Sequence, residues 1–238
     1  MHGTGIRDIL VTGDFEVQNV LSMLTRLFSG MAPQSPPGKL KAFPEYPAGK
    51  TKFLPVNEDP LDKAIVRKAW RADVAPLDRR SMIARSIVVY ALRDRLYQTF
   101  RVKLGASYSP KAHDYQMEAC NGFGFFMAEV TTSGKRINAI QNWLRDIERQ
   151  FISHGIRERE LQHMRKALFS SWKDKQKDDR YQHMVQRKVL LTWLPYDAWD
   201  AEYGSVLESL TAREVSKQAS AIFSGEKAVL IIHGRERK

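Results

Sequence analysis

Two residues in this sequence combine side chains and spacing suited to chemistry. Arg101 and Tyr108 lie in the segment Leu96–Ser109, which reads LYQTFRVKLGASYS. A guanidinium carries a permanent positive charge and a phenol donates a hydrogen bond. Gly105, between them, allows the chain to reverse tightly, so both groups can project into one cleft. The alternative is structural: Arg101 is a surface cation in the last helical turn, and Tyr108 a half-buried strand aromatic.

Other catalytic patterns are absent from the sequence. No two of the six histidines are four residues apart, and neither H-E-x-x-H nor H-x-x-E-H occurs, so no helix presents paired imidazoles to zinc. There is no G-x-S-x-G elbow and no Walker A loop. The single cysteine, Cys120, can form neither an intrachain disulfide nor a thiolate cluster. It does not indicate whether the protein lies in an oxidising or a reducing compartment. The chain therefore shows no complete catalytic set.

The composition indicates a soluble globular protein. The 238 residues are 43% apolar and 27% charged, with a net charge of +11, which is too apolar for disorder. The most apolar stretch, 87–92, is too short to span a membrane, and the amino terminus lacks the pattern of a secretory signal. The basic residues are dispersed and alternate with acidic ones between 173 and 179. This pattern disfavours nucleic-acid binding and is typical of a solvated helix face.

The first 50 residues predict the end of one domain and a linker. Residues 9–11 are expected to form a strand, followed by a helix that Asp14 caps and Gly30 closes. The segments ILVTGDF and VLIIHGRE, near the two ends of the chain, each resemble the terminal strand of a domain. Five of the ten prolines lie in residues 32–50, which predicts an extended linker. We therefore expect residues 1–31 to end a preceding homologous domain.

Residues 51–238 predict a single α+β domain. Two strands are expected at 52–56 and 64–70, an antiparallel pair at 108–115 and 122–132, and a closing strand at 228–233. The expected helices are 81–104, 133–151, 158–191 and 196–210, with Ser133 capping the second and a Thr211–Glu214 capping box opening one more.

These segments resemble the non-catalytic half of the insulinase/pitrilysin family of zinc peptidases, the inverzincins. The Arg…Leu-Gly-x-x-Tyr-Ser pattern from Arg101 to Ser109 is similar to that family's signature. The opening LVTGDFEVQNVLSMLTRLFSGM resembles its sequence of hydrophobic strand, Gly-Asp, helix and Phe-Gly. The order that follows also matches, from the Pro-rich linker to the helix that ends at His154-Gly155-Ile156. The resemblance is close over residues 9–168 and loose beyond.

The resemblance implies a fold and a different role for each half of the peptidase. Each half of such a peptidase consists of α+β domains with a mostly antiparallel sheet flanked by helices. The amino-terminal half binds zinc through H-x-x-E-H and a downstream Glu, so no metal or cofactor ligand is expected in this chain. By position, Arg101 and Tyr108 would act in catalysis by binding the substrate peptide and stabilising its carbonyl oxygen in the transition state. The expected partners are a zinc-bearing half, in the same polypeptide or a separate subunit, and a peptide substrate; no nucleic acid and no membrane span are expected.

Other functions remain open at this point. Family members that have lost peptidase activity act as structural or assembly subunits with the same fold, although such a scaffold has no chemical need for both Arg101 and Tyr108. A basic chamber could prefer acidic peptides, but simple solubility also explains dispersed positive charge.

Overall fold

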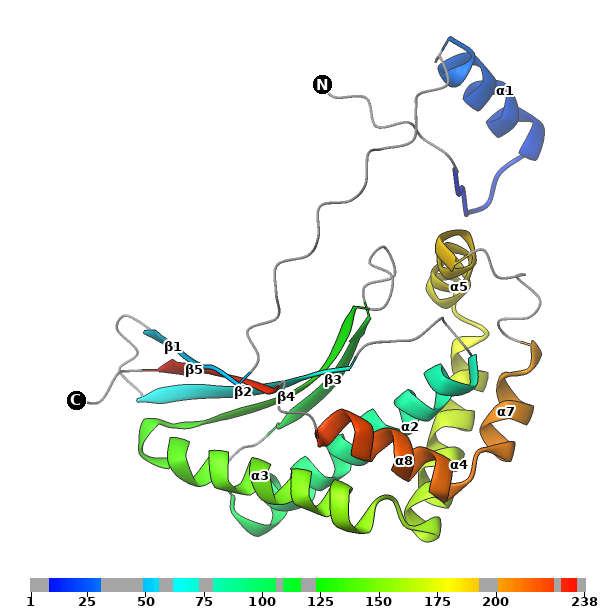
Figure 1. Cartoon of the computed structure of the whole chain (residues 1–238). Helices are drawn as coiled ribbons and strands as arrows, with labels where there is room; N and C mark the ends of the chain where they lie inside the picture. The colour runs from blue at the N-terminus through cyan, green and yellow to red at the C-terminus, as the bar shows by residue number, and fades with distance from the viewer. Residues whose placement is uncertain are drawn as a thin grey trace.

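The computed structural model describes residues 9–30, 49–55, 62–72, 79–105, 109–116, 123–192, 201–224 and 228–234. Figure 1 shows the elements along the chain. They are α1 (Val17–Phe28), β1 (Thr51–Pro55), β2 (Lys63–Arg71), α2 (Arg79–Leu96), the π-helix η1 (Tyr97–Lys103), β3 (Lys111–Gln116), β4 (Gly124–Ser133), the 3-10 turn η2 (Gly134–Arg136), α3 (Ile137–His154), α4 (Glu158–Lys175), α5 (Asp179–Thr192), α7 (Tyr203–Ser209), α8 (Ala212–Phe223) and β5 (Ala228–Gly234).

The strands form one five-stranded sheet in the order β1-β5-β2-β4-β3. The β5–β2, β2–β4 and β4–β3 pairs are antiparallel, and only β1 and β5 run parallel. The closing strand therefore lies inside the sheet, between the first two strands. The predicted α+β fold with a mostly antiparallel sheet is confirmed, as is the antiparallel pairing of β3 with β4.

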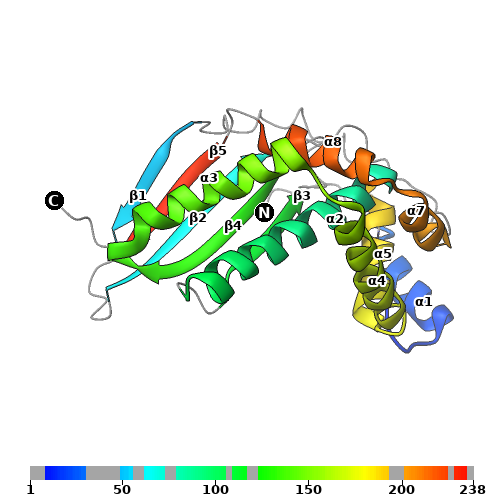
Figure 2. The ribbon, with the colours of Figure 1, turned by 90° about the horizontal axis from the view of Figure 1, so that it is seen from below.

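Helices α2, α3 and α8 cover one face of the sheet (Figure 2). Alternate residues of β4 point to this face and are buried, as expected for a half-covered strand. Trp70 of β2 packs edge-on against Phe223 of α8, with ring centroids 5.0 Å apart, and Phe223 in turn stacks 4.5 Å from Phe151 of α3. This aromatic cluster joins the sheet to α3 and α8.

The opposite face of the sheet carries cross-strand ion pairs. Glu129 of β4 lies between Arg67 of β2, at 2.7 Å, and Lys111 of β3, at 3.2 Å. Burial by itself raises the pKa of Glu129, but the hydrogen bonds from Arg67 and Lys111 outweigh this effect, so that its pKa is lowered. These pairs connect three neighbouring strands on the face that none of the described helices covers.

The first predicted strand is wrong. Residues 9–11 have no strand structure, and helix α1 begins after Glu16, whose side chain makes no capping hydrogen bond; Asp14 is not the cap. A short apolar run specifies a strand only where a neighbouring strand completes its hydrogen bonds, and the described residues supply none here. The contact made by this segment is polar, between Thr12 Oγ1 and His183 Nδ1 of α5 at 2.7 Å.

Other predicted helix boundaries differ from the observed ones. The predicted helix 158–191 divides after Lys175, because the Asp178 side chain accepts the backbone N–H of Arg180 at 2.9 Å and opens α5. Ser133 is the last residue of β4 and makes no side-chain cap; the turn η2 separates it from α3. The helix predicted at 196–210 is observed as α7, its first part lying outside the described residues, as does most of the predicted linker.

Two predicted helix ends are confirmed. Gly155 closes α3 with a positive φ of 63°, and its backbone N–H donates to Phe151 O. The Thr211–Glu214 capping box opens α8, with both reciprocal hydrogen bonds present. In both cases the deciding interactions are local in sequence, which is why spacing alone predicts them.

Candidate functional site

Arg101 lies in η1, where the long predicted helix changes character. The helix predicted at 81–104 is observed as α2 followed by the π-helix, and the N–H of Leu104 bonds to Thr99 O at 3.1 Å, five residues back. The wider turn buries Phe100 and leaves Arg101 exposed. Such π-helical turns occur frequently at functional sites.

The Arg101 side chain lies over an aromatic ring of the same turn. Its guanidinium carbon is 5.1 Å from the ring centroid of Tyr97, which is itself 38% exposed. A cation–π contact at such an exposed site contributes about 0.5–1 kcal/mol. The Arg101 side chain is therefore exposed and lies against its own turn.

Gly105 ends this helix, as predicted. Its φ is 53°, in the left-handed region, and a Cβ added there would meet no atom within 4 Å. The need for glycine is therefore conformational rather than steric. Tyr108 and Cys120 lie outside the described residues. The predicted proximity of Arg101 and Tyr108 accordingly stays a prediction.

A buried ion pair holds the elements on either side of this segment together. Arg85 of α2 is 2% exposed and contacts Asp114 of β3 through two nitrogens, at 2.5 and 3.1 Å. Its Nη1 donates to Ala72 O at 3.2 Å, and its guanidinium stacks 4.8 Å from the ring of Phe126. The ion pair therefore fixes β3 against the second turn of α2. Sequence analysis missed this pair, because nothing local distinguishes Arg85 from the surface arginines of the same helix.

The described residues provide no metal site. No three His, Cys, Asp or Glu side chains come together within the part of the chain that the structure describes. The family resemblance implies zinc on the other half of the peptidase, so no chemical step through a metal is assigned to these residues. Within the same residues, no helix has the length and apolar character needed to cross a membrane.

The fold is shared with solved structures of peptidase-related proteins. PqqL, a periplasmic protease of Escherichia coli, superposes with a TM-score of 0.71 over 94% of this chain at 17% identity. A peptidase M16 inactive domain from Pseudomonas fluorescens gives 0.73 over 94% at 16% identity, and a protease from Helicobacter pylori 0.73 over 93% at 12%. This chain spans only 25%, 52% and 53% of those three chains, respectively.

Sequence comparison is more specific about the family. No curated protein matches the chain. The family model described as "Peptidase M16 inactive domain", however, matches residues 8–168, which is more than half of the chain. This range contains the whole of β1 to β4, both α2 and η1, and the Arg101–Ser109 segment. The chain therefore belongs to the inactive-domain family of the M16, or insulinase-type, peptidases.

Proposed function

We propose that this chain is the substrate-binding part of a zinc-dependent peptidase, in which Arg101 and Tyr108 contact the bound peptide. The observation that carries the proposal is the family match across the Arg101–Ser109 segment, together with the exposed guanidinium at the end of η1. A family of inactive domains related to peptidases suits a binding role better than an independent catalytic one. The zinc and the general base are expected on the other half of the enzyme.

The proposed role follows from the charge that peptide hydrolysis generates. Attack of water on the scissile carbonyl places negative charge on its oxygen. Tyr108 donates a hydrogen bond to this oxygen or to the adjacent backbone, and Arg101 places a fixed cation on the same peptide. A guanidinium stays protonated at any working pH, so Arg101 adds no limb to the pH–rate profile.

We also propose that residues 1–31 belong to the preceding homologous domain, that residues 32–50 are the linker, and that residues 51–238 form the second domain. Helix α1 supports this division because none of its residues is buried. Its apolar side chains are exposed instead, with Val17 at 59%, Leu21 at 50% and Leu27 at 59%. An amphipathic helix normally buries such a stripe, and a preceding domain would supply the missing surface.

The test compares three variants of the complete peptidase. Tyr108→Phe and Arg101→Ala each lower kcat/KM, by about 100- to 1000-fold if either acts as an oxyanion donor, without unfolding the domain. Arg93→Ala is the matched control, since Arg93 is exposed on α2. Unchanged turnover in both test variants would contradict the proposed roles. The isolated chain is expected to bind no catalytic zinc and to cleave no peptide.

An assembly subunit is the competing outcome of the same experiment. If the complete protein contains no tightly bound zinc and no chelator-sensitive activity, the M16 fold serves as a scaffold. Metal analysis of the complete protein, together with the peptidase assay, distinguishes the two functions.

A further inference from the structure

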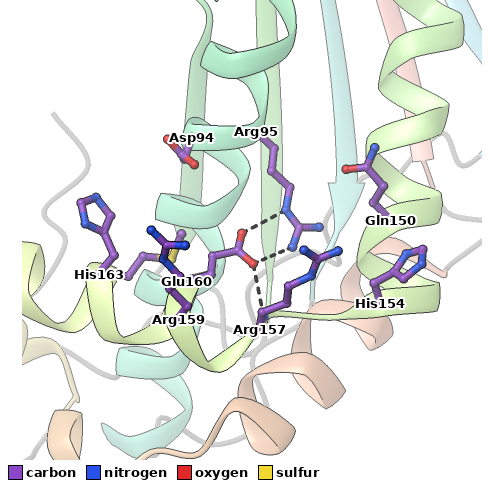
Figure 3. A pocket seen from close by; sticks show the side chains of 9 residues that line it. Asp94, Arg95, Gln150, His154, Arg157, Arg159, Glu160 and His163 are labelled. Carbon is purple, nitrogen blue, oxygen red and sulfur yellow. Dashed lines mark hydrogen bonds and ion pairs between the residues drawn. The ribbon is translucent and has the colours of Figure 1, made fainter.

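A basic cleft lies among three helices of the domain, and Arg101 is not among the residues that line it. It encloses about 770 Å³ between the last turns of α2, the end of α3 and the first turns of α4 (Figure 3). This volume is in the range of small-molecule sites. The lining side chains that carry or can acquire positive charge are Arg95, His154, Arg157, Arg159 and His163.

One wall of the cleft is a fixed, electrically neutral pair. Arg95 of α2 bonds through Nε and Nη2 to the two carboxylate oxygens of Glu160, at 3.1 and 3.0 Å. The same Nη2 donates to Gly155 O at 2.6 Å, and the guanidinium stacks 3.8 Å from the ring of Phe151. Glu160 also accepts the backbone N–H of Arg157 at 3.3 Å. The negative charge of Glu160 is therefore already engaged.

Beyond this pair the lining carries the cations of Arg157 and Arg159 and one further carboxylate, that of Asp94. The side chains of Arg157 and Arg159 are exposed, and neither forms an ion pair with any residue that the structure describes. In Figure 3 the Arg157 side chain points into the space between Arg95 and His154, whereas Arg159 points to the other side of Glu160. The guanidinium groups of Arg95 and Arg157 therefore lie close together, with His154 beside them.

Two further features favour an anion at this position. The Nη1 of Arg95 is buried and lacks a hydrogen-bond partner among the described residues, although such groups are normally satisfied. The cleft also lies at the amino terminus of α4, an 18-residue helix whose dipole favours negative charge there. The remaining carboxylate of the first turn, Glu158, is directed to other partners, bonding to Gln162 at 3.0 Å and pairing with Arg165 at 3.7 Å.

We propose that this cleft binds a phosphate-bearing ligand, with a phosphate group held between Arg157, Arg95 and His154. Guanidinium groups match phosphate oxygens in bidentate geometry, and several donors converging from different helices suit a group with three or more acceptor oxygens. The volume accommodates more than a single phosphate, so the group can belong to inorganic pyrophosphate or to an organic phosphate ester.

Calorimetric titration of the 238-residue chain with pyrophosphate at low ionic strength tests the proposal. Saturable binding with one site per chain is expected. Arg157→Gln should weaken pyrophosphate binding by about tenfold or more, because it removes a charge-assisted hydrogen bond to phosphate. Arg159→Gln should weaken it by only about two- to threefold, because Arg159 acts as a nearby charge that does not bond to the phosphate. Arg145→Gln is the matched control. Arg145 is exposed on α3, bonds to Asn142 and does not line the cleft, so its loss should leave the affinity unchanged.

Parallel titrations identify the ligand chemistry. Inorganic phosphate and phenyl phosphate should both compete with pyrophosphate. The relative affinities of these two competitors show whether the cleft prefers free phosphate or a phosphate ester. Citrate, a polycarboxylate, should bind more weakly. Tighter binding of citrate, an absence of saturable pyrophosphate binding, or equal weakening by all three arginine variants would each overturn the proposal. The peptidase role does not depend on this result, because it is tested through Arg101 and Tyr108.

Discussion

Helix α2 and the π-helix η1 are continuous along the chain but differ sharply in their surroundings. Most of the central residues of α2 are buried, including the charged Arg85, whereas Phe100 is the one buried residue of η1. The apolar spacing of four residues from Val88 to Phe100 runs through both elements. One periodic pattern therefore supports a helix that forms the core and a final turn that presents Arg101 to solvent.

The comparison shows that an arginine's role depends on its tertiary partners. Arg85 and Arg101 lie 16 residues apart (101 − 85) in one helical run. Arg85 is sealed against Asp114 and Phe126, while Arg101 rests on Tyr97 at the surface. Loss of Arg85 should lower stability most, and loss of Arg101 should lower activity far more than stability.

The largest stability effect is expected at Arg85. Arg85→Ala leaves Asp114 as an unpaired, mostly buried carboxylate, so the free energy of unfolding should fall by about 3–5 kcal/mol. Urea denaturation followed by circular dichroism measures this loss. Arg93→Ala is the control: Arg93 is exposed on α2 and loses only a cation–π contact with Tyr90, so the value should change by less than about 1 kcal/mol.

A double variant sharpens the interpretation of Arg85. Arg85→Met combined with Asp114→Leu removes both charges and should recover much of the lost stability, because no buried charge is left unpaired. If Arg85→Ala alone proved neutral, the buried pair would not be what anchors β3 to α2.

A smaller effect is expected at Gly105, where η1 ends. Gly105→Ala places a Cβ in the left-handed region and should cost about 1 kcal/mol. Gly30→Ala is a close control: Gly30 also has open space around it but no positive φ, so its substitution should be nearly neutral. Equal effects at the two glycines would mean that the turn after η1 does not depend on the backbone conformation of Gly105.

The smallest effect concerns the other end of α2, where Arg80 holds Glu214 of α8 at 2.8 Å. Hydrogen bonds from the backbone N–H and the hydroxyl of Thr211, and then from Arg80, lower the pKa of Glu214 to about 2 from an ordinary value of 4.5. The charged form stabilises the folded state, so this contribution is complete above about pH 4.5 and is lost as the pH falls towards 2.

The pH dependence of melting provides the measurement. The melting temperature of the unmodified chain should exceed that of Glu214→Gln at neutral pH, and the difference should shrink between pH 4.5 and 2. Glu208→Gln serves as the control, since Glu208 is an exposed carboxylate of α7. If the difference in melting temperature stayed constant down to pH 2, the stabilisation would not come from the charge of Glu214.

The sequence predicted more of the fold than of the site. It located β2, β4, β5 and the Thr211 capping box because their signals lie within a few residues. It failed at residues 9–11, where a strand requires a distant partner to pair with. It predicted the helix end at Gly105, and the role of Arg101 stays a prediction; it did not predict the Arg85–Asp114 and Arg95–Glu160 pairs, whose members are 29 and 65 residues apart.

The amino-acid sequence by itself determined most of the helical and strand segments, their order and the resemblance to the insulinase family, since periodicity, capping and motif order are properties of near neighbours. Tertiary structure alone decided that β5 enters between β1 and β2, that α2 loosens into a π-helix at Arg101, and that three helices enclose a basic cleft. These features depend on contacts between residues far apart in the chain, and their free energy is realised only when the whole core assembles.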